Sequence, residues 1–244
     1  MATIRAIVVV TVVLLYIFLT APPMLIYSVL ARETDSIYAV GRFGATIAVW
    51  LAGIKLDVRH REKIPVGQAA LFLANHQSNC DPPALVSILP PIWIMAKKEF
   101  FRIPFLNIAM RMRGFISIDR SNRAAAIQSV DRAAESLKSG RPFIAYPEGT
   151  RSPDGRIQNF KRGVFVMAIK AGAPIVPISV SGAHKIMTKG KWAIHPGTLR
   201  ITFHDPVPTA GLVHEDRGRL SRQVREIIIS GLTEQERPKE SAGS

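Results

Sequence analysis

The sequence predicts an α/β fold, with a mixed, largely parallel sheet flanked by helices and an N-terminal membrane-docking segment of two helices. Two observations support this prediction. From residue 56 onward, short apolar runs of strand length alternate with amphipathic helical patterns. Before that point, residues 6–31 carry no charge and form the most apolar stretch of the chain. We therefore expect membrane attachment at 1–55, an α/β domain at 56–232 and a disordered polar tail at 233–244.

The N-terminal apolar stretch is long enough to cross a bilayer. As one straight helix, residues 6–31 would span about 39 Å, against a hydrocarbon core of about 30 Å. Pro22 and Pro23 should interrupt this helix, so a kinked span and an insertion into one leaflet both remain open. A cleaved signal peptide fits less well, because the apolar run continues past Pro23 without a clear cleavage site. A second apolar stretch at 38–54 contains Trp50 and is typical of a helix at the membrane interface.

The elements of the α/β domain follow in order. Short apolar runs predict strands at 56–59, 69–74, 92–96, 115–118, 143–146, 175–180 and 199–203. Apolar residues at helical spacing predict helices from 82 and at 104–112, 123–138, 163–171 and 219–229. Pro82 suits the first turn of its helix, and Gly140 ends the helix at 123–138.

The composition favours an anionic, lipid-like partner. The net charge is +14 and the isoelectric point is about 10.5. A mean hydropathy of +0.17 and 48% hydrophobic residues are unusual for a nucleic-acid binder, and no RNA- or DNA-binding motif is present. The basic residues therefore point to a membrane surface, where anionic lipid attracts each nearby Lys or Arg by about 1 kcal/mol.

The cysteine and histidine pattern points to neither disulfides nor metal. Cys80 is the only cysteine, so no intrachain disulfide can form. The histidines show no HExxH spacing and no Cys/His ligand pattern. We therefore predict no bound metal.

Residues 75–82, NHQSNCDP, hold the candidate catalytic pair. His76 leaves the predicted strand at 69–74, and Asp81 stands where the next helix begins. A loop between them allows the two side chains to meet, and an aspartate that accepts the Nδ1 proton of a histidine leaves Nε2 free to take a proton from a substrate hydroxyl. The alternative is that Asp81 only caps the helix, with Pro82 at its first position.

A second candidate group follows the predicted strand at 143–146, and its members are Glu148, Gly149, Thr150 and Arg151. Arg151 can bind a phosphate through two parallel hydrogen bonds, and Gly149 lets the backbone come close to a ligand. Glu148 would repel a phosphate, so we expect it to pair with a cation or to hold a substrate hydroxyl. An ordinary turn with a solvated ion pair is the alternative. If the strands run parallel, Arg151 and His76 share one edge of the sheet.

Further cations stand at other strand exits. Arg120 follows the predicted strand at 115–118, and Lys97 follows the strand at 92–96. Each is a candidate phosphate contact, although Asp119 and Arg120 could equally cap the next helix. A single surface lysine is usually solvated, so the recurrence of cations after strand ends carries the argument.

These blocks, in this order, resemble the 1-acyl-sn-glycerol-3-phosphate acyltransferases, a family of glycerolipid acyltransferases. The matching positions are the His-x4-Asp motif at His76 and Asp81, a second block at 114–120, a third at 148–151 and a fourth around Pro177. The likeness covers residues 75–180. The chain departs from the pattern at Ser117, where a bulky apolar residue is usual, and at Tyr146, where phenylalanine is usual.

The resemblance implies transfer of a fatty acyl group from acyl-CoA or acyl-ACP to the sn-2 hydroxyl of lysophosphatidate, giving phosphatidate, with the thioester as co-substrate and no further cofactor. It implies His76 as general base, Asp81 as its partner and Arg151 as the anchor of the acceptor phosphate. Arg120 and Lys97 would support that anchor. The implied partners are the phospholipid bilayer, lysophosphatidate and the acyl carrier, without nucleic acid. The basic residues favour the cytoplasmic face of a membrane, which would be the inner membrane in a bacterium.

Several alternatives share these residues. The acceptor could be another lysolipid, such as a lysophospholipid or lyso-ornithine lipid, or glycerol-3-phosphate. Water could replace the acceptor, which would make the protein a hydrolase. Cys80 could carry the acyl group covalently. A non-catalytic lipid-binding protein would use the charge and the apolar segments for membrane association alone.

Overall fold

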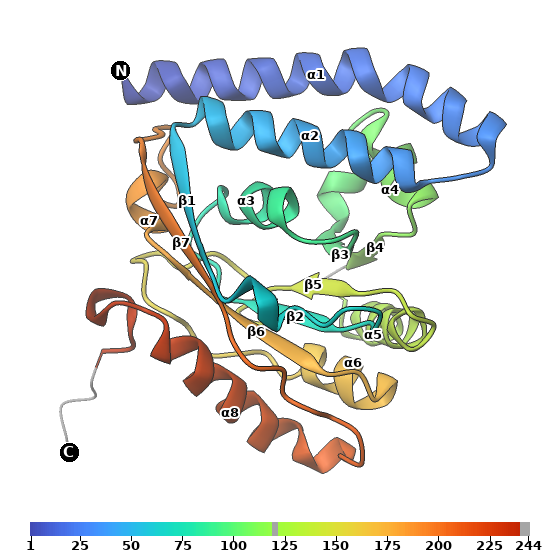
Figure 1. The fold of residues 1–244 in the computed structure, drawn as a ribbon, viewed down its shortest axis with the longest axis vertical. Coiled ribbons are helices and arrows are strands. Elements are labelled where there is room, and N and C mark those ends of the chain that lie inside the picture. The colour runs from blue at the N-terminus through green and yellow to red at the C-terminus, as the bar shows by residue number, and fades with distance from the viewer. Residues whose placement is uncertain (119–121, 240–244) are drawn as a thin grey trace.

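The computed structural model describes residues 1–118 and 122–239, and within these ranges seven strands form one sheet in the order β1-β7-β6-β2-β5-β3-β4 (Figure 1). The strands are β1 Ile54–Arg59, β2 Leu71–Ala74, β3 Trp93–Lys97, β4 Ile116–Ile118, β5 Phe143–Ala145, β6 Ile175–Ser181 and β7 Gly197–Phe203. The pair β6 and β7 is antiparallel, and the other five pairs are parallel. The mixed, largely parallel sheet predicted from the sequence is confirmed.

Helices cover both faces of this sheet. One face carries α1 Ala2–Ala31, α2 Asp35–Leu51 and α3 Asp81–Ile88, and the other carries α5 Arg123–Lys138, α6 Gly163–Ala171 and α8 Arg217–Ser230 (Figure 1). Two shorter helices are α4 Leu106–Met112, beside α1, and α7 Ala183–Ile186, after β6. Four 3₁₀ turns complete the described chain: η1 Arg61–Lys63, η2 Lys98–Arg102, η3 His214–Asp216 and η4 Glu234–Glu236.

The central strands are buried on both sides, which explains why they read as continuous apolar runs. Phe72 in β2 packs into the core under α1, α2 and α3, whereas its neighbours Leu71 and Leu73 pack into the core against α5, α6 and α8. Parallel strands covered by helices on both faces need apolar residues at every position. Because β2 and β5 run parallel, their carboxyl ends reach the same edge of the sheet, and the loops that follow them meet there.

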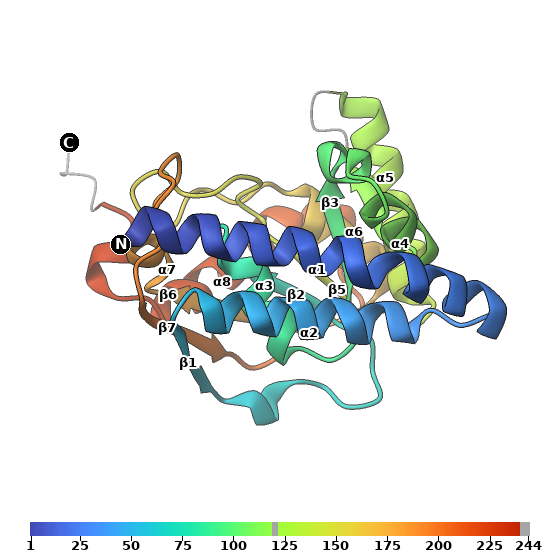
Figure 2. The same cartoon turned by 90° about the horizontal axis from the view of Figure 1, so that it is seen from above.

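The N-terminal helix lacks the interruption that its prolines predicted. Helix α1 runs continuously through Pro22 and Pro23 (Figure 2). Each proline removes one backbone donor, yet the helix continues past both, and α1 lies alongside α2. The hydroxyl of Tyr16 donates a hydrogen bond to the carbonyl of Val40 across the helix pair at 2.8 Å.

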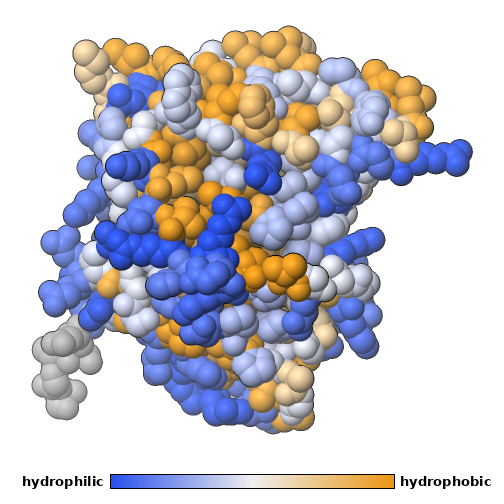
Figure 3. All heavy atoms as spheres, viewed as in Figure 1, coloured by the Kyte–Doolittle hydropathy of each residue, from blue (hydrophilic) through white to orange (hydrophobic). Residues whose placement is uncertain are grey.

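Most of α1 faces away from the protein. It is the one described helix that could cross a membrane by length and composition, and only 6% of its most apolar part is buried within the protein. Phe18, Leu19 and Leu30 are among its exposed apolar side chains, and Figure 3 shows apolar surface gathered along the edge that α1 forms. Such a helix suggests membrane association.

The polar tail is ordered over part of the range in which we predicted disorder. After α8 the chain forms the turn η4, and Glu236 is buried. Its carboxylate accepts hydrogen bonds from residues far away in the sequence, which holds this segment in place although it buries few apolar groups. Residues 240–244 lie outside the described part of the chain, and so does Arg120.

Candidate active site

His76 and Asp81 meet in the loop between β2 and α3, as their spacing allowed. The Nδ1 atom of His76 lies 2.8 Å from Oδ2 of Asp81. The Asp81 side chain is fully buried, whereas 16% of the His76 side chain is exposed. The pair therefore has one partner fixed in the protein and one that solvent or a substrate can reach.

Asp81 is a hydrogen-bond acceptor for its own loop and does not cap α3. Cys80 occupies the N-cap position, and Asp81 is already helical, which corrects the predicted cap. Its Oδ2 atom accepts the backbone N–H groups of Gln77 at 2.7 Å and Ser78 at 2.8 Å.

The same contacts assign the proton on His76. An oxygen that accepts two backbone N–H groups is an acceptor for its third partner as well, so Nδ1 is the donor of this hydrogen bond. In the neutral imidazole with this tautomer, Nε2 has no proton and can act as a base.

Tyr146 fixes the plane of the imidazole. The rings of His76 and Tyr146 stack with centroids 4.1 Å apart and planes 22° apart. Burial raises the pKa of Tyr146 well above its ordinary value, and the buried Asp81 carboxylate raises it further. The phenol therefore stays neutral, and the ring acts as an apolar support that a phenylalanine would also provide.

Glu148 holds the backbone of His76, which differs from the predicted pairing with a cation or a substrate hydroxyl. Its Oε1 accepts the backbone N–H of His76 at 2.7 Å, and its Oε2 accepts the backbone and side-chain N–H groups of Gln158, both at 3.1 Å. Burial raises the pKa of Glu148 to about 7, and these hydrogen bonds offset part of that effect. On the other side, the backbone N–H of Ser152 donates to the carbonyl of His76 at 2.8 Å. The loop after β5 thus clamps His76 by both of its peptide groups.

Comparison with models of protein families identifies the family of this chain. Residues 55–181 match the family model described as Acyltransferase. This chain belongs to the acyltransferase family.

The relatives of this acyltransferase carry more specific names. It is 33% identical over 170 residues to a chloroplast 1-acyl-sn-glycerol-3-phosphate acyltransferase of Arabidopsis thaliana, which covers 69% of this chain and 48% of that protein. It is 32% identical over 187 residues to the human 1-acyl-sn-glycerol-3-phosphate acyltransferase alpha, covering 76% and 66% of the two chains. The chain spans about half the length of the chloroplast relatives.

A solved structure shares the whole architecture. The crystal structure of a 1-acyl-sn-glycerophosphate acyltransferase from Thermotoga maritima superposes with a TM-score of 0.80 at 29% identity, and the match covers 94% of this chain and 92% of that one. The family resemblance predicted from the four sequence blocks is confirmed.

The acyltransferase places Arg151 beside an apolar pocket next to the His-Asp loop. The cavity has a volume of about 640 Å³ and is lined mainly by α1 and α2, with Cys80, Arg151 and Trp192 toward the loop. Thr150 is exposed, and Gly149 has φ +75°. A Cβ atom on Gly149 would lie 3.0 Å from the Lys161 side chain, so glycine allows this close approach.

Lys189 is a cation that sequence reasoning missed. Its Nζ atom donates to the carbonyl of Arg151 at 2.8 Å and lies 3.4 Å from the Thr150 hydroxyl. The signal was present in the run Lys189-Gly190-Lys191-Trp192, where two cations precede an exposed tryptophan. Of the other predicted cations, Lys97 ends β3, and its side chain is outside the described part of the structure.

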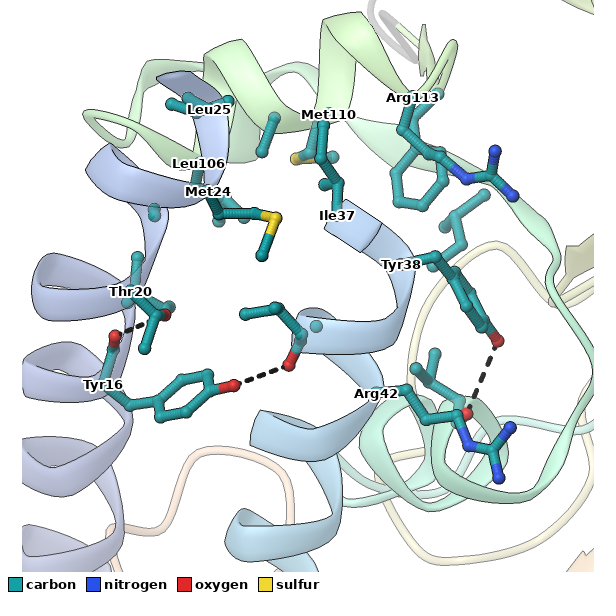
Figure 4. A pocket seen from close by; sticks show the side chains of 18 residues that line it. Tyr16, Thr20, Met24, Leu25, Ile37, Tyr38, Arg42, Leu106, Met110 and Arg113 are labelled. Atoms are coloured by element: carbon teal, nitrogen blue, oxygen red, sulfur yellow. Dashed lines mark hydrogen bonds between the residues drawn. The ribbon is translucent and has the colours of Figure 1, made fainter. Parts of the chain in front are cut away.

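A second apolar cavity, of about 180 Å³, lies farther along the helix pair between α1, α2 and α4 (Figure 4). Met24, Ile37 and Met110 project into it from the three helices. Tyr16, Ile17, Gly41 and Leu106 line both cavities. The two cavities are therefore neighbours along the groove between the two N-terminal helices.

Replacing Cys80 with alanine is expected to leave most acyl-transfer turnover intact. Cys80 is buried, and burial raises the pKa of its thiol to about 11, so the nucleophilic thiolate is rare near neutral pH. The measurement is the initial rate of thioester consumption for wild type and Cys80→Ala. A near-complete loss of rate, together with a thioester trapped on the wild-type protein, would establish the covalent route instead.

Proposed function

We propose that this acyltransferase moves a fatty acyl group from an acyl thioester to the sn-2 hydroxyl of lysophosphatidate, giving phosphatidate. The observation that carries the proposal is the buried Asp81 carboxylate bonded to His76, in a loop whose Asn79 and Cys80 line an apolar pocket formed mainly by α1 and α2. A base, a chain-sized apolar space and a cation at one place suit an acceptor with a hydroxyl, a fatty chain and a phosphate.

The reaction proceeds by direct attack. Nε2 of His76 takes the proton of the acceptor hydroxyl while its oxygen forms a bond to the thioester carbonyl carbon. The carbon–sulfur bond then breaks, and the departing thiolate takes the proton back from His76. Asp81 stabilises the imidazolium that exists between these two proton transfers. The acyl group is thereby moved to oxygen, and the free thiol of coenzyme A or of the acyl carrier protein leaves.

The N-terminal helices give this chemistry access to its lipids. With the exposed apolar side of α1 in the bilayer interface, a lysolipid can reach His76 without its whole chain entering water. The excess of basic residues favours the cytoplasmic side.

The test is an assay of the purified full-length protein with lysophosphatidate and a radiolabelled acyl thioester. The expected product is phosphatidate, formed faster than free fatty acid. A panel of acceptors with one donor, including glycerol-3-phosphate and lysophospholipids, identifies the acceptor, and matched acyl-CoA and acyl-ACP donors identify the carrier. Release of fatty acid without phosphatidate would mean that the protein is a hydrolase.

Replacing Arg151 with alanine is expected to lower kcat/KM for lysophosphatidate by about tenfold to a hundredfold, since a hydrogen bond to a charged group contributes about 1.5–3 kcal/mol. The loss should be much smaller for monoacylglycerol, which lacks the phosphate. Arg219→Ala is the matched control, because Arg219 is exposed on α8 and paired with Asp216. An equal loss of kcat/KM for both acceptors would show that Arg151 does not bind the phosphate.

A further inference from the structure

The turn η4 places a buried carboxylate against the loop that carries His76. Oε1 of Glu236 accepts the side-chain N–H of Gln77 at 3.0 Å and the backbone N–H of Gly182 at 2.7 Å. Its Oε2 accepts the hydroxyl of Ser181 at 2.6 Å, and the hydroxyl and backbone N–H of Thr233 at 2.8 and 3.1 Å. One side chain therefore joins the C-terminal segment, the end of β6 and the catalytic loop.

Gln77 links Glu236 to the His76–Asp81 pair through hydrogen bonds. Its side chain also donates to the carbonyl of Gly155 at 3.0 Å and accepts the backbone N–H of His184 at 3.3 Å, so three separate segments hold it. Its own backbone N–H donates to Oδ2 of Asp81, the oxygen that bonds His76. A shift of Gln77 would therefore rotate a donor away from the carboxylate that orients the base.

We propose that Glu236 is a positioning residue for the His76–Asp81 pair and acts through Gln77. This inference rests on the proposed function, since it assumes that the pair is the base of the reaction. The C-terminal segment, which follows the matched family region at 55–181, thereby becomes part of the support of the site.

A glutamate suits this position better than a neutral side chain. Burial raises the pKa of Glu236, but the hydrogen bonds from Ser181, Gly182, Gln77 and Thr233 outweigh that effect, and the pKa is lowered overall. Two carboxylate oxygens can accept all of these donors at once, whereas an amide offers one oxygen. The backbone carbonyl of Glu236 adds a bond from the N–H of Ile157 at 2.8 Å, which ties the segment to the loop that also supplies Gly155.

The experiment compares Glu236→Ala, Glu236→Gln, Gln77→Ala and the double variant Glu236→Ala/Gln77→Ala in the full-length protein, assayed well below each melting temperature. Glu236→Ala is expected to lower kcat about tenfold with KM for both substrates nearly unchanged, because misplacement of a catalytic group acts on the chemical step. Glu236→Gln keeps the acceptor for Gln77 and should recover most of the rate. The double variant should be no slower than the slower single variant, because both changes interrupt the same series of hydrogen bonds from Glu236 through Gln77 to Asp81.

Thr233→Val separates positioning from stability. It removes a hydrogen bond from the same carboxylate on the tail side and leaves Gln77 in place, so it should lower the melting temperature while kcat stays within about twofold. A Glu236→Ala protein that melts earlier but keeps the wild-type kcat would overturn the proposal. Strictly additive losses in the double variant would overturn it as well.

A spectroscopic readout makes the test independent of the substrate. The Nδ1 proton of a histidine bonded to a carboxylate gives a downfield proton resonance, which Asp81→Asn assigns in this protein. The resonance should shift or broaden in Glu236→Ala and remain in Thr233→Val. If it is unchanged in Glu236→Ala, the proposal fails; if wild type keeps the resonance but makes no phosphatidate, the proposed function fails.

Discussion

Replacing His76 with alanine is expected to lower kcat for acyl transfer by about 10² to 10⁴, the range that a general base contributes. Asp81 is fully buried on the Nδ1 side of the imidazole, so without His76 the acceptor hydroxyl would have to lose its proton to water. The measurement is the initial rate of phosphatidate formation from a radiolabelled thioester, with flotation on phospholipid vesicles as a second readout. Vesicle association should be unchanged, since α1 is untouched.

His214→Ala is the matched control for this substitution. His214 is exposed in η3, just before α8. Its replacement should leave the rate of phosphatidate formation and the vesicle association at the wild-type level. A His76→Ala protein that keeps its turnover would exclude the general-base mechanism, and it would support a non-catalytic lipid-binding protein.

Replacing Asp81 with asparagine is expected to lower kcat by about 10² to 10⁴ while the loop keeps its shape. An asparagine oxygen in the place of Oδ2 can still accept from Gln77, Ser78 and His76, so the geometry survives. The negative charge that stabilises the imidazolium is lost, and the amide nitrogen takes the buried position of Oδ1, which has no partner within the described residues.

The control for Asp81→Asn is thermal unfolding. A buried isosteric change in an intact hydrogen-bond network should shift the melting temperature by only a few degrees, whereas kcat falls by orders of magnitude. If kcat instead stays within about twofold of wild type, Asp81 serves the fold of the loop and the charge of the pair has no role in catalysis.

Local signals predicted most of the fold and the two catalytic candidates. The apolar runs placed every strand to within a few residues. The signal was clearest for β2 and β5, which are buried on both faces and apolar throughout. The pair His76 and Asp81 could be predicted because the residues are five apart in sequence, and a short loop limits how far they can separate. The hydrogen bonds of Glu148 to His76 and Gln158 were not predicted, because Gln158 lies outside the motif and a sequence window shows no burial.

Two other expectations failed because contacts with segments far away in the sequence do not show in the local composition. Two prolines predicted a break in α1, but the helix is continuous and lies alongside α2, an element that a local sequence window does not take into account. The tail beyond Thr233 has a polar composition that predicts disorder, yet Glu236 is held by Gln77 and Ser181, which lie far away in the sequence.

The amino-acid sequence by itself determined the class of sheet, the apolar N-terminal helices, the family and the close pairing of His76 with Asp81, because each depends on periodicity or on neighbours in the chain. Only the tertiary structure decided which groups hold that pair in place. Tyr146 and Glu148 from the loop after β5, Gln77 from the loop after β2 and Glu236 from η4 support His76 and Asp81 from three parts of the chain. Their contacts form only when β2, β5 and β6 bring their carboxyl ends to one edge of the sheet, and hydrogen bonds between distant segments leave no pattern in a single sequence.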